Sequence, residues 1–177
     1  MDYSKYLYDA SQVDLYIANL GKYNEGELEG GWISLPTAEE TIREFLEKVV
    51  GINKDYEEWA IHDYQGELIK PDEYDDIFEL NEQAEKLSDL KEWEIRTLRA
   101  AVEYFGQEAF DYEIEDFMLY EDIHTHYDLG YYWAEESGCY QLDGVLAMYF
   151  DYEAFGRDIA IETCGGFTKY GFIELRK

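Results

Sequence analysis

Basic residues are scarce in this sequence. Its 177 residues include 14 Lys and Arg against 42 Asp and Glu, and the formal net charge is −28. Duplex nucleic acid is therefore excluded as a direct partner, because binding it depends on Lys and Arg that displace counterions from the phosphates. An anionic membrane surface is disfavoured for the same reason.

Cysteine and long apolar runs are also rare. Cys139 and Cys164 show no metal-binding or CxxC spacing, and the opening "MDYSKYLYDASQ" lacks the apolar core of a signal peptide. No stretch approaches the roughly 20 apolar residues of a membrane span. These absences predict a cytoplasmic protein with free thiols and no membrane partner.

Hydrophobic and aromatic residues, in contrast, are plentiful. They make up 46% and 18% of the chain, too much for a disordered protein. The chain is therefore folded and extremely acidic, and its length fits one ordinary domain or two to three very small ones.

Residues 1–12 show no regular period and are interpreted as a loose lead-in, followed by an α+β domain over 13–70. "VDLYIANL" alternates apolar residues on one face, and "GKYNEG" supplies turn residues before "LEGGWISLP", which predicts a β-hairpin. "YEEWAIHDY" adds a third strand to an antiparallel sheet.

A helix is expected between these strands. Thr37 and Glu40 have the spacing of a capping box, and apolar residues follow at helical intervals up to Gly51.

Residues 71–108 predict a central helical domain. In its first helix Ile77, Leu80, Ala84 and Leu87 form an apolar stripe, and acidic residues from 75 to 89 project from the opposite side. Phe78 fits neither side and marks a contact with another element. A second helix is expected over about 90–105, ending at Gly106.

Residues 109–177 predict a C-terminal α+β domain. "FMLY" at 117–120 is typical of a strand, "DLGYYWAEES" of a short helix closed by Gly138, and "VLAMYFDYEAF" of another helix. "RDIAIETCGGFTKYGFIEL" is interpreted as a terminal hairpin that turns at Gly165 and Gly166.

The negative charge is distributed unevenly. Between Arg99 and Arg157 there are fourteen Asp and Glu and not one Lys or Arg, whereas a surface built for solubility mixes both signs. We also expect no pairing of Glu with Lys four residues apart on the helices. A solvated acidic surface or adaptation to high salt would explain such charge, although the many aromatic residues argue against the latter. A third explanation is that rigid carboxylate faces occupy the basic groove of a DNA-binding enzyme.

Catalytic and metal-binding patterns are weak. His124 and His126 form an HxH pair beside Asp122 and Asp128, which is an incomplete metal site, and Ser137 lacks the glycines of a nucleophile elbow. We therefore expect no enzyme activity, no metal and no cofactor.

Four segments, in the right order over about residues 13–175, resemble the ArdA family of antirestriction proteins. They are "YIANLGKYNEGELEGGWISLP", "YEEWAIHDY", "DLGYYWAEESG" and "YFDYEAFGRDI". The third resembles the family's antirestriction motif, in the region that the family uses for dimerisation. This motif and dimer region would comprise Asp128, Leu129, Gly130, Tyr131, Tyr132, Trp133, Ala134, Glu135, Glu136 and Gly138. Two positions depart from it: Gly130 stands where Ala is common, and Tyr131 where Arg is common.

The resemblance implies an elongated chain of three small domains that forms a curved homodimer through the third. Such proteins are carried on mobile genetic elements, mimic bent B-form DNA and inhibit Type I restriction-modification enzymes at the specificity and methyltransferase subunits. A general acidic decoy or chaperone for basic nucleic-acid-binding proteins is the alternative. The carboxylates expected to stand in for phosphates are Asp63, Asp72, Glu73, Asp75, Asp76, Glu79, Glu82, Glu85, Asp89, Glu103, Glu108, Asp111, Glu113, Glu115, Asp116, Glu121 and Asp122.

Overall fold

The computed structural model describes residues 10–140, 142 and 144–176, so most of the expected lead-in lies outside the described residues. The chain divides into two compact units, one up to Leu90 and one from Lys91. Each contains a three-stranded antiparallel sheet with helices, which confirms the predicted α+β class. The division into three domains stays a prediction.

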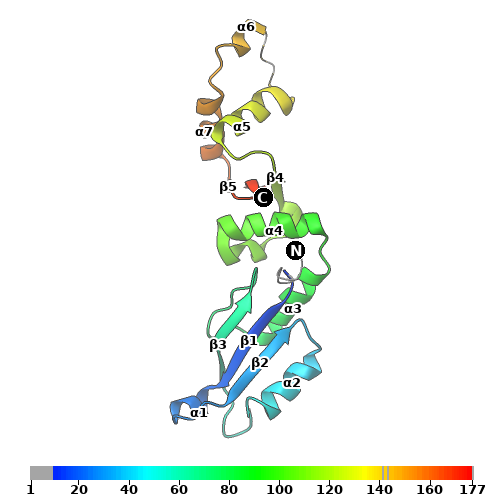
Figure 1. Cartoon of the computed structure of the whole chain (residues 1–177), viewed down its shortest axis with the longest axis vertical. Coiled ribbons are helices and arrows are strands. Elements are labelled where there is room, and N and C mark those ends of the chain that lie inside the picture. The colour runs from blue at the N-terminus through cyan, green and yellow to red at the C-terminus, as the bar shows by residue number, and fades with distance from the viewer. Residues whose placement is uncertain (1–9, 141, 143, 177) are drawn as a thin grey trace, which may run out of the picture. The chain divides into compact units, whose positions relative to one another are not determined.

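The sheet of the first unit has the strand order β2-β1-β3 (Figure 1). Its strands are β1 (Val13–Asn19), β2 (Gly30–Leu35) and β3 (Trp59–Gly66). The predicted alternation is confirmed, because Val13, Leu15 and Ile17 are all at most 1% exposed. The β1–β2 hairpin also forms, although its connection contains a short helix, α1 (Leu20–Asn24).

Asn19 explains why a helix replaces the expected turn. Its side-chain oxygen accepts a hydrogen bond from the Lys22 backbone N–H at 3.0 Å, which caps α1. Its Nδ2 donates to the Val50 carbonyl at 3.1 Å, so the fully buried amide has partners on both sides.

The helix expected after β2 is α2 (Glu39–Lys48), which buries Ile42 and Leu46. The predicted capping box of Thr37 and Glu40 is wrong, since Ala38 occupies the N-cap position and makes no side-chain cap. Asn81 is the physical reason. Its Oδ1 accepts from the Thr37 N–H at 2.8 Å and its Nδ2 donates to the Thr37 carbonyl at 3.0 Å, which holds Thr37 outside the helix.

Replacing Asn81 with Ala should lower the free energy of unfolding by about 1–3 kcal/mol, because two backbone groups of Thr37 lose their partner and Asn81 itself is 2% exposed. Urea titration followed by circular dichroism measures the change. Gln83→Ala on the same helix is the matched control, with an expected change within about 0.5 kcal/mol. Equal losses in the two variants would contradict the role of Asn81.

The acidic segment forms α3 (Ile77–Ser88), and its predicted apolar stripe is confirmed by the burial of Ile77, Leu80, Ala84 and Leu87. The predicted contact of Phe78 is also confirmed: the Arg43 guanidinium of α2 lies 5.0 Å from its ring centroid. Asn81 and Phe78 thus fasten α3 to the segment around α2.

The second unit begins with α4 (Glu92–Phe105), which ends at Gly106 as predicted, with φ +70°. This helix packs against a sheet of strand order β4-β6-β5. The strands are β4 (Phe117–Tyr120), β5 (Gly165–Thr168) and β6 (Gly171–Leu175), and two 3-10 helices, η2 (Gly106–Asp111) and η3 (Ile114–Asp116), lead from α4 to β4.

The predicted turn at Gly165 and Gly166 is wrong. Both glycines lie within β5, and the hairpin turns between Thr168 and Gly171. A Cβ on Gly165 would overlap the Ile173 carbonyl, and one on Gly166 would overlap the Tyr104 ring. These glycines therefore permit close packing across the strand and do not form the turn.

The helix prediction before this hairpin needs two corrections. The segment "VLAMYFDYEAF" is interrupted, because α6 (Gly144–Ala147) ends well before α7 (Tyr152–Glu162) begins. Asp151 starts the second helix by accepting a hydrogen bond from the Ala154 N–H at 2.9 Å. The residues "RDIAIE", expected in the hairpin, complete α7.

The antirestriction-like motif forms α5 (His126–Tyr131) and a π-helical turn, η4 (Tyr132–Glu136), and closes at Gly138 with φ +73°. Leu129 is fully buried with Ile123 and Phe172. α5 packs closely against α7 (Figure 1).

Candidate functional site

The carboxylates of α3 fall into two groups. Asp76 is the N-cap and accepts from the Phe78 N–H at 2.7 Å, and Asp75 accepts from the Asp72 N–H at 2.8 Å. Both precede the helix, so the expectation that they belong to its acidic face is wrong. The face proper consists of Glu79, Glu82, Glu85 and the C-cap residue Asp89, called here the α3 carboxylates.

All but one of the seventeen carboxylates singled out from the sequence are exposed, the exception being the half-buried Asp116. The structure divides them between two units. The first unit carries Asp63, Asp72, Glu73, Asp75, Asp76, Glu79, Glu82, Glu85 and Asp89, and the second carries Glu103, Glu108, Asp111, Glu113, Glu115, Asp116, Glu121 and Asp122.

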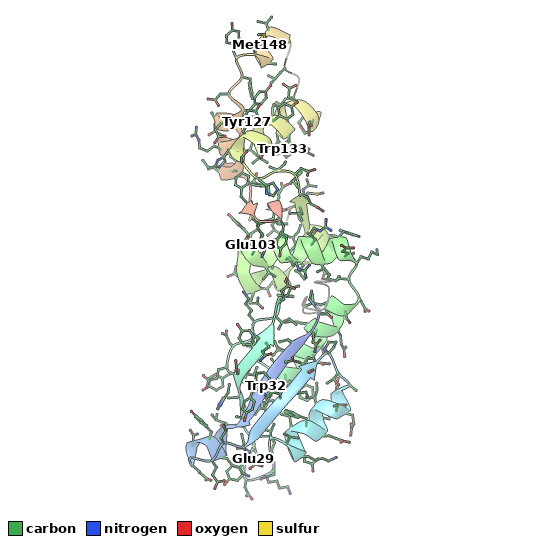
Figure 2. The ribbon with its side chains drawn as sticks, viewed as in Figure 1. Glu29, Trp32, Glu103, Tyr127, Trp133 and Met148 are labelled. Atoms are coloured by element: carbon green, nitrogen blue, oxygen red, sulfur yellow. The ribbon has the colours of Figure 1, made fainter. Side chains whose placement is uncertain are left out.

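Some of these groups are engaged within the fold. Glu121 accepts from the Arg96 guanidinium at 2.6 Å, and Glu103, labelled on α4 in Figure 2, accepts from the Lys169 N–H at 2.9 Å. Glu79 and Glu82, by comparison, have no hydrogen bond or ion pair to any residue that the structure describes. The unengaged carboxylates are the ones most available to a partner.

Ion pairs along the helices occupy several of the few basic residues. Arg43 binds Glu39 at 2.9 Å and Lys48 binds Glu44 at 2.8 Å, each four residues apart on α2. Arg96 makes the same kind of pair on α4. The expectation that such pairs are missing is therefore wrong. Arg43, Lys48 and Arg96 therefore pair with acids of their own helices and not with the α3 carboxylates.

Asp128 fixes the start of the motif helix. Thr125 Oγ1 accepts from the Asp128 N–H at 3.1 Å, and Asp128 Oδ2 accepts from the Thr125 N–H at 2.9 Å, which is a capping box. A hydrogen bond from Thr125 is the main reason that the pKa of Asp128 lies below its ordinary value, and its own partial burial acts against this. Asp128 is therefore ionised at neutral pH.

The other motif residues are divided between core and surface. Leu129, Gly130 and Ala134 are buried, Tyr132 and Trp133 are half-buried, and Tyr131, Glu135, Glu136 and Gly138 are exposed. Figure 2 labels Trp133 among the side chains of this segment. The motif thus supplies both packing residues and exposed polar groups.

Gly130 and Gly156 let α5 and α7 touch backbone to backbone. A Cβ on Gly130 would overlap the Tyr152 carbonyl, and one on Gly156 would overlap the His126 carbonyl. The departure from Ala at position 130 is thereby explained, because this crossing leaves no space for a methyl group.

Tyrosines surround that crossing. The Tyr152 hydroxyl donates to Glu135 at 2.6 Å, and this hydrogen bond is the main cause that raises the Tyr152 pKa to about 12. Tyr152 also contacts Tyr127 and Tyr131, with ring centroids 5.5 and 5.4 Å away. The Tyr152 hydroxyl consequently stays protonated throughout the physiological range.

The HxH pair is not assembled into a metal site in the described part of the chain. His126 lies 3.7 Å from Glu153 and packs edge-on against Phe167, while Asp128 caps its helix. Among the described residues, His, Cys, Asp and Glu form no group of three or more able to hold a metal ion. None of the described helices is long and apolar enough to cross a membrane.

A hollow beside the motif was missed at the sequence level. It has a volume of about 390 Å³ and includes Tyr120, Ile123 and Tyr127 in its lining, none of which was singled out as a site residue. Tyr127 and Tyr131 are four residues apart and therefore share a helix face, which is the signal that could have indicated it.

Comparison with known proteins decides the family. The sequence model of the antirestriction protein (ArdA) family matches residues 15–174, which is nearly the whole chain. The chain belongs to the ArdA antirestriction family. The resemblance read from the four segments is confirmed. No match was found among curated proteins.

ArdA membership implies an antirestriction function directed at restriction-modification enzymes. It also implies an inhibitor protein and not an enzyme. The matched range contains all seventeen carboxylates and the complete motif, so both features lie in the part of the chain that is typical of ArdA.

Proposed function

We propose that this ArdA protein mimics bent B-form DNA and competitively occupies the DNA-binding groove of Type I restriction-modification enzymes, at the specificity and methyltransferase subunits. The observation that carries the proposal is a set of exposed carboxylates on packed elements, in a chain whose residues 100–156 include no Lys or Arg. Family membership supplies the class of target.

The amount of charge is suitable for such a mimic. Duplex DNA carries about two negative charges per base pair. A homodimer of the protein, which we propose forms through the C-terminal domain, would carry twice −28, or −56. This formal charge corresponds to roughly 28 base pairs at the same ratio.

Folded protein also has an energetic advantage over DNA in a groove that bends its ligand. Bending a DNA site of 20–30 base pairs costs about 1–6 kcal/mol of free energy. A protein that folds directly into the bent form binds without this cost. The mimic offers carboxylates without base edges, so it should inhibit enzymes of different target sequence alike.

The test is displacement of labelled DNA from a purified Type I methyltransferase, measured by fluorescence anisotropy at about 50 and 200 mM salt. We expect competition at low salt and at least about tenfold weaker inhibitor binding at high salt, because screening reduces exposed charge interactions. Failure to displace DNA at low salt would exclude the mechanism.

A basic DNA-binding protein unrelated to restriction, such as a histone-like protein, serves as the control in the same assay. We expect at least tenfold weaker displacement there. Equal displacement from both proteins would instead favour the general acidic decoy.

A further inference from the structure

The hollow beside the motif has walls of tyrosine. The residues that line it include Tyr120 of β4, Tyr127 and Tyr131 of α5, Tyr132 of η4 and the buried Ile123. The rings of Tyr127 and Tyr131 are nearly parallel, with an interplanar angle of 15° and centroids 6.3 Å apart. Figure 2 labels Tyr127 in this part of the second unit.

Carboxylates complete the lining. Glu121, Asp122, Asp128 and Glu136 border the same hollow, and Glu121 forms an ion pair with Arg96. Asp122 and Glu136 are exposed and make no hydrogen bond or ion pair with any described residue. These two carboxylates therefore face the hollow without a described ion-pair partner.

Aromatic faces and carboxylates together favour a cation. A guanidinium within about 6 Å of a tyrosine ring is attracted by the ring quadrupole, and it also forms charge-assisted hydrogen bonds to carboxylates. Two arginines of the protein already contact residues that line the hollow. Arg96 binds Glu121, and the Arg176 guanidinium lies 5.9 Å from the Tyr120 ring centroid and donates to its hydroxyl at 2.6 Å.

We infer that this hollow is a receptor for an arginine side chain of the partner enzyme, held between the α5 tyrosines and the free carboxylates Asp122 and Glu136. The inference rests on the proposed function and adds a discrete recognition point to a distributed charge surface. A second copy of the chain is the weaker candidate as occupant of the hollow, because it has only 14 Lys and Arg to offer, whereas a groove that binds DNA is lined by such residues.

The full chain is titrated with N-acetyl-arginine amide, and binding is followed by NMR shifts of the tyrosine rings. N-acetyl-citrulline amide, which has nearly the same shape and no charge, is the matched control probe. We expect saturable binding of the arginine probe that shifts Tyr127 and Tyr131, and no saturation with citrulline. Equal responses to both probes, or no saturable response to arginine, would overturn the inference.

Two variants locate the site. Tyr131→Leu should lower the affinity for the arginine probe about 2- to 5-fold. Tyr131→Phe keeps the ring and should leave this affinity within about twofold of the wild type. Because Tyr131 also packs on Tyr152, the pair Asp122→Asn and Glu136→Gln provides a second variant on exposed groups. Circular dichroism checks the fold. Unchanged probe affinity in the carboxylate variant would overturn the inference.

The same carboxylate variant identifies the occupant. We expect weaker displacement of DNA from the methyltransferase and unchanged self-association by sedimentation. Altered self-association with unchanged displacement would assign the hollow to a second copy and overturn the choice of partner. If the wild type binds the arginine probe but never displaces DNA, the proposed function fails and the cation site stands. If the wild type displaces DNA but does not bind the arginine probe, the inferred cation site fails and the proposed function stands.

Discussion

Adding a methyl group at Gly156 or Gly130 should destabilise the second unit by about 3 kcal/mol or more. The backbones of α5 and α7 are in contact at this crossing, and a Cβ at either position would overlap a carbonyl of the other helix. Overpacking commonly costs about 1–3 kcal/mol, and backbone atoms cannot move aside as a flexible side chain can. The gain of about 0.5–1 kcal/mol in helix propensity offsets only part of this loss.

Thermal and urea unfolding of Gly156→Ala and Gly130→Ala measure the effect, with the two units allowed separate transitions. Gly144→Ala in α6 is the matched control, since its Cβ would meet no atom within 4 Å, and it should be neutral or stabilising by up to about 1 kcal/mol. A neutral result for both Gly130→Ala and Gly156→Ala would show that the helices cross less closely.

Converting Glu79, Glu82 and Glu85 together to Gln should weaken inhibition of a Type I enzyme roughly 3- to 100-fold. Exposed charge contacts contribute about 0.2–1 kcal/mol each, and three are removed. Glu85 accepts from Asn81 Nδ2 at 3.0 Å, and a Gln side-chain oxygen can keep that hydrogen bond. DNA displacement from the methyltransferase is the measurement.

Stability should change little in this triple variant. Relief of repulsion between residues three apart gives about 0.2–0.5 kcal/mol per pair, while losing Glu79 from the first turn costs about 0.3–1 kcal/mol of helix-dipole stabilisation. Weaker inhibition in a stable protein therefore reports the interface and not unfolding.

A matched charge control is Glu27→Gln, Glu40→Gln and Glu47→Gln, three exposed carboxylates outside the proposed set. We expect inhibition within about twofold of the wild type for this variant. Equal weakening by the two triples would mean that net charge matters and the positions do not, as for a general decoy.

The local periodicities were readable from the sequence because they depend on neighbours along the chain. The alternation of Val13, Leu15 and Ile17 and the stripe from Ile77 to Leu87 each needed only the spacing of one element. The capping box at Thr37 could not be judged in this way, because the deciding side chain, Asn81, is 44 residues away.

In the candidate site, too, some features follow from the local sequence and others depend on the fold. Exposure of the carboxylates follows from their polarity, whereas their separation into engaged and available groups depends on where each helix begins. Asp75 and Asp76 became loop and cap residues because α3 starts at Ile77. The hollow combines Tyr120 of β4 with α5 and η4, which only the packing of the second unit brings together.

The attachment of α3 by Asn81 and Phe78 has a consequence for recognition. Because the helix is held to the rest of its unit before a partner arrives, its carboxylates keep a fixed mutual spacing set by helical geometry. Association then requires little further loss of backbone freedom, so more of the attraction is retained as affinity. A single uncharged amide thus helps to determine how effectively the surrounding acids compete.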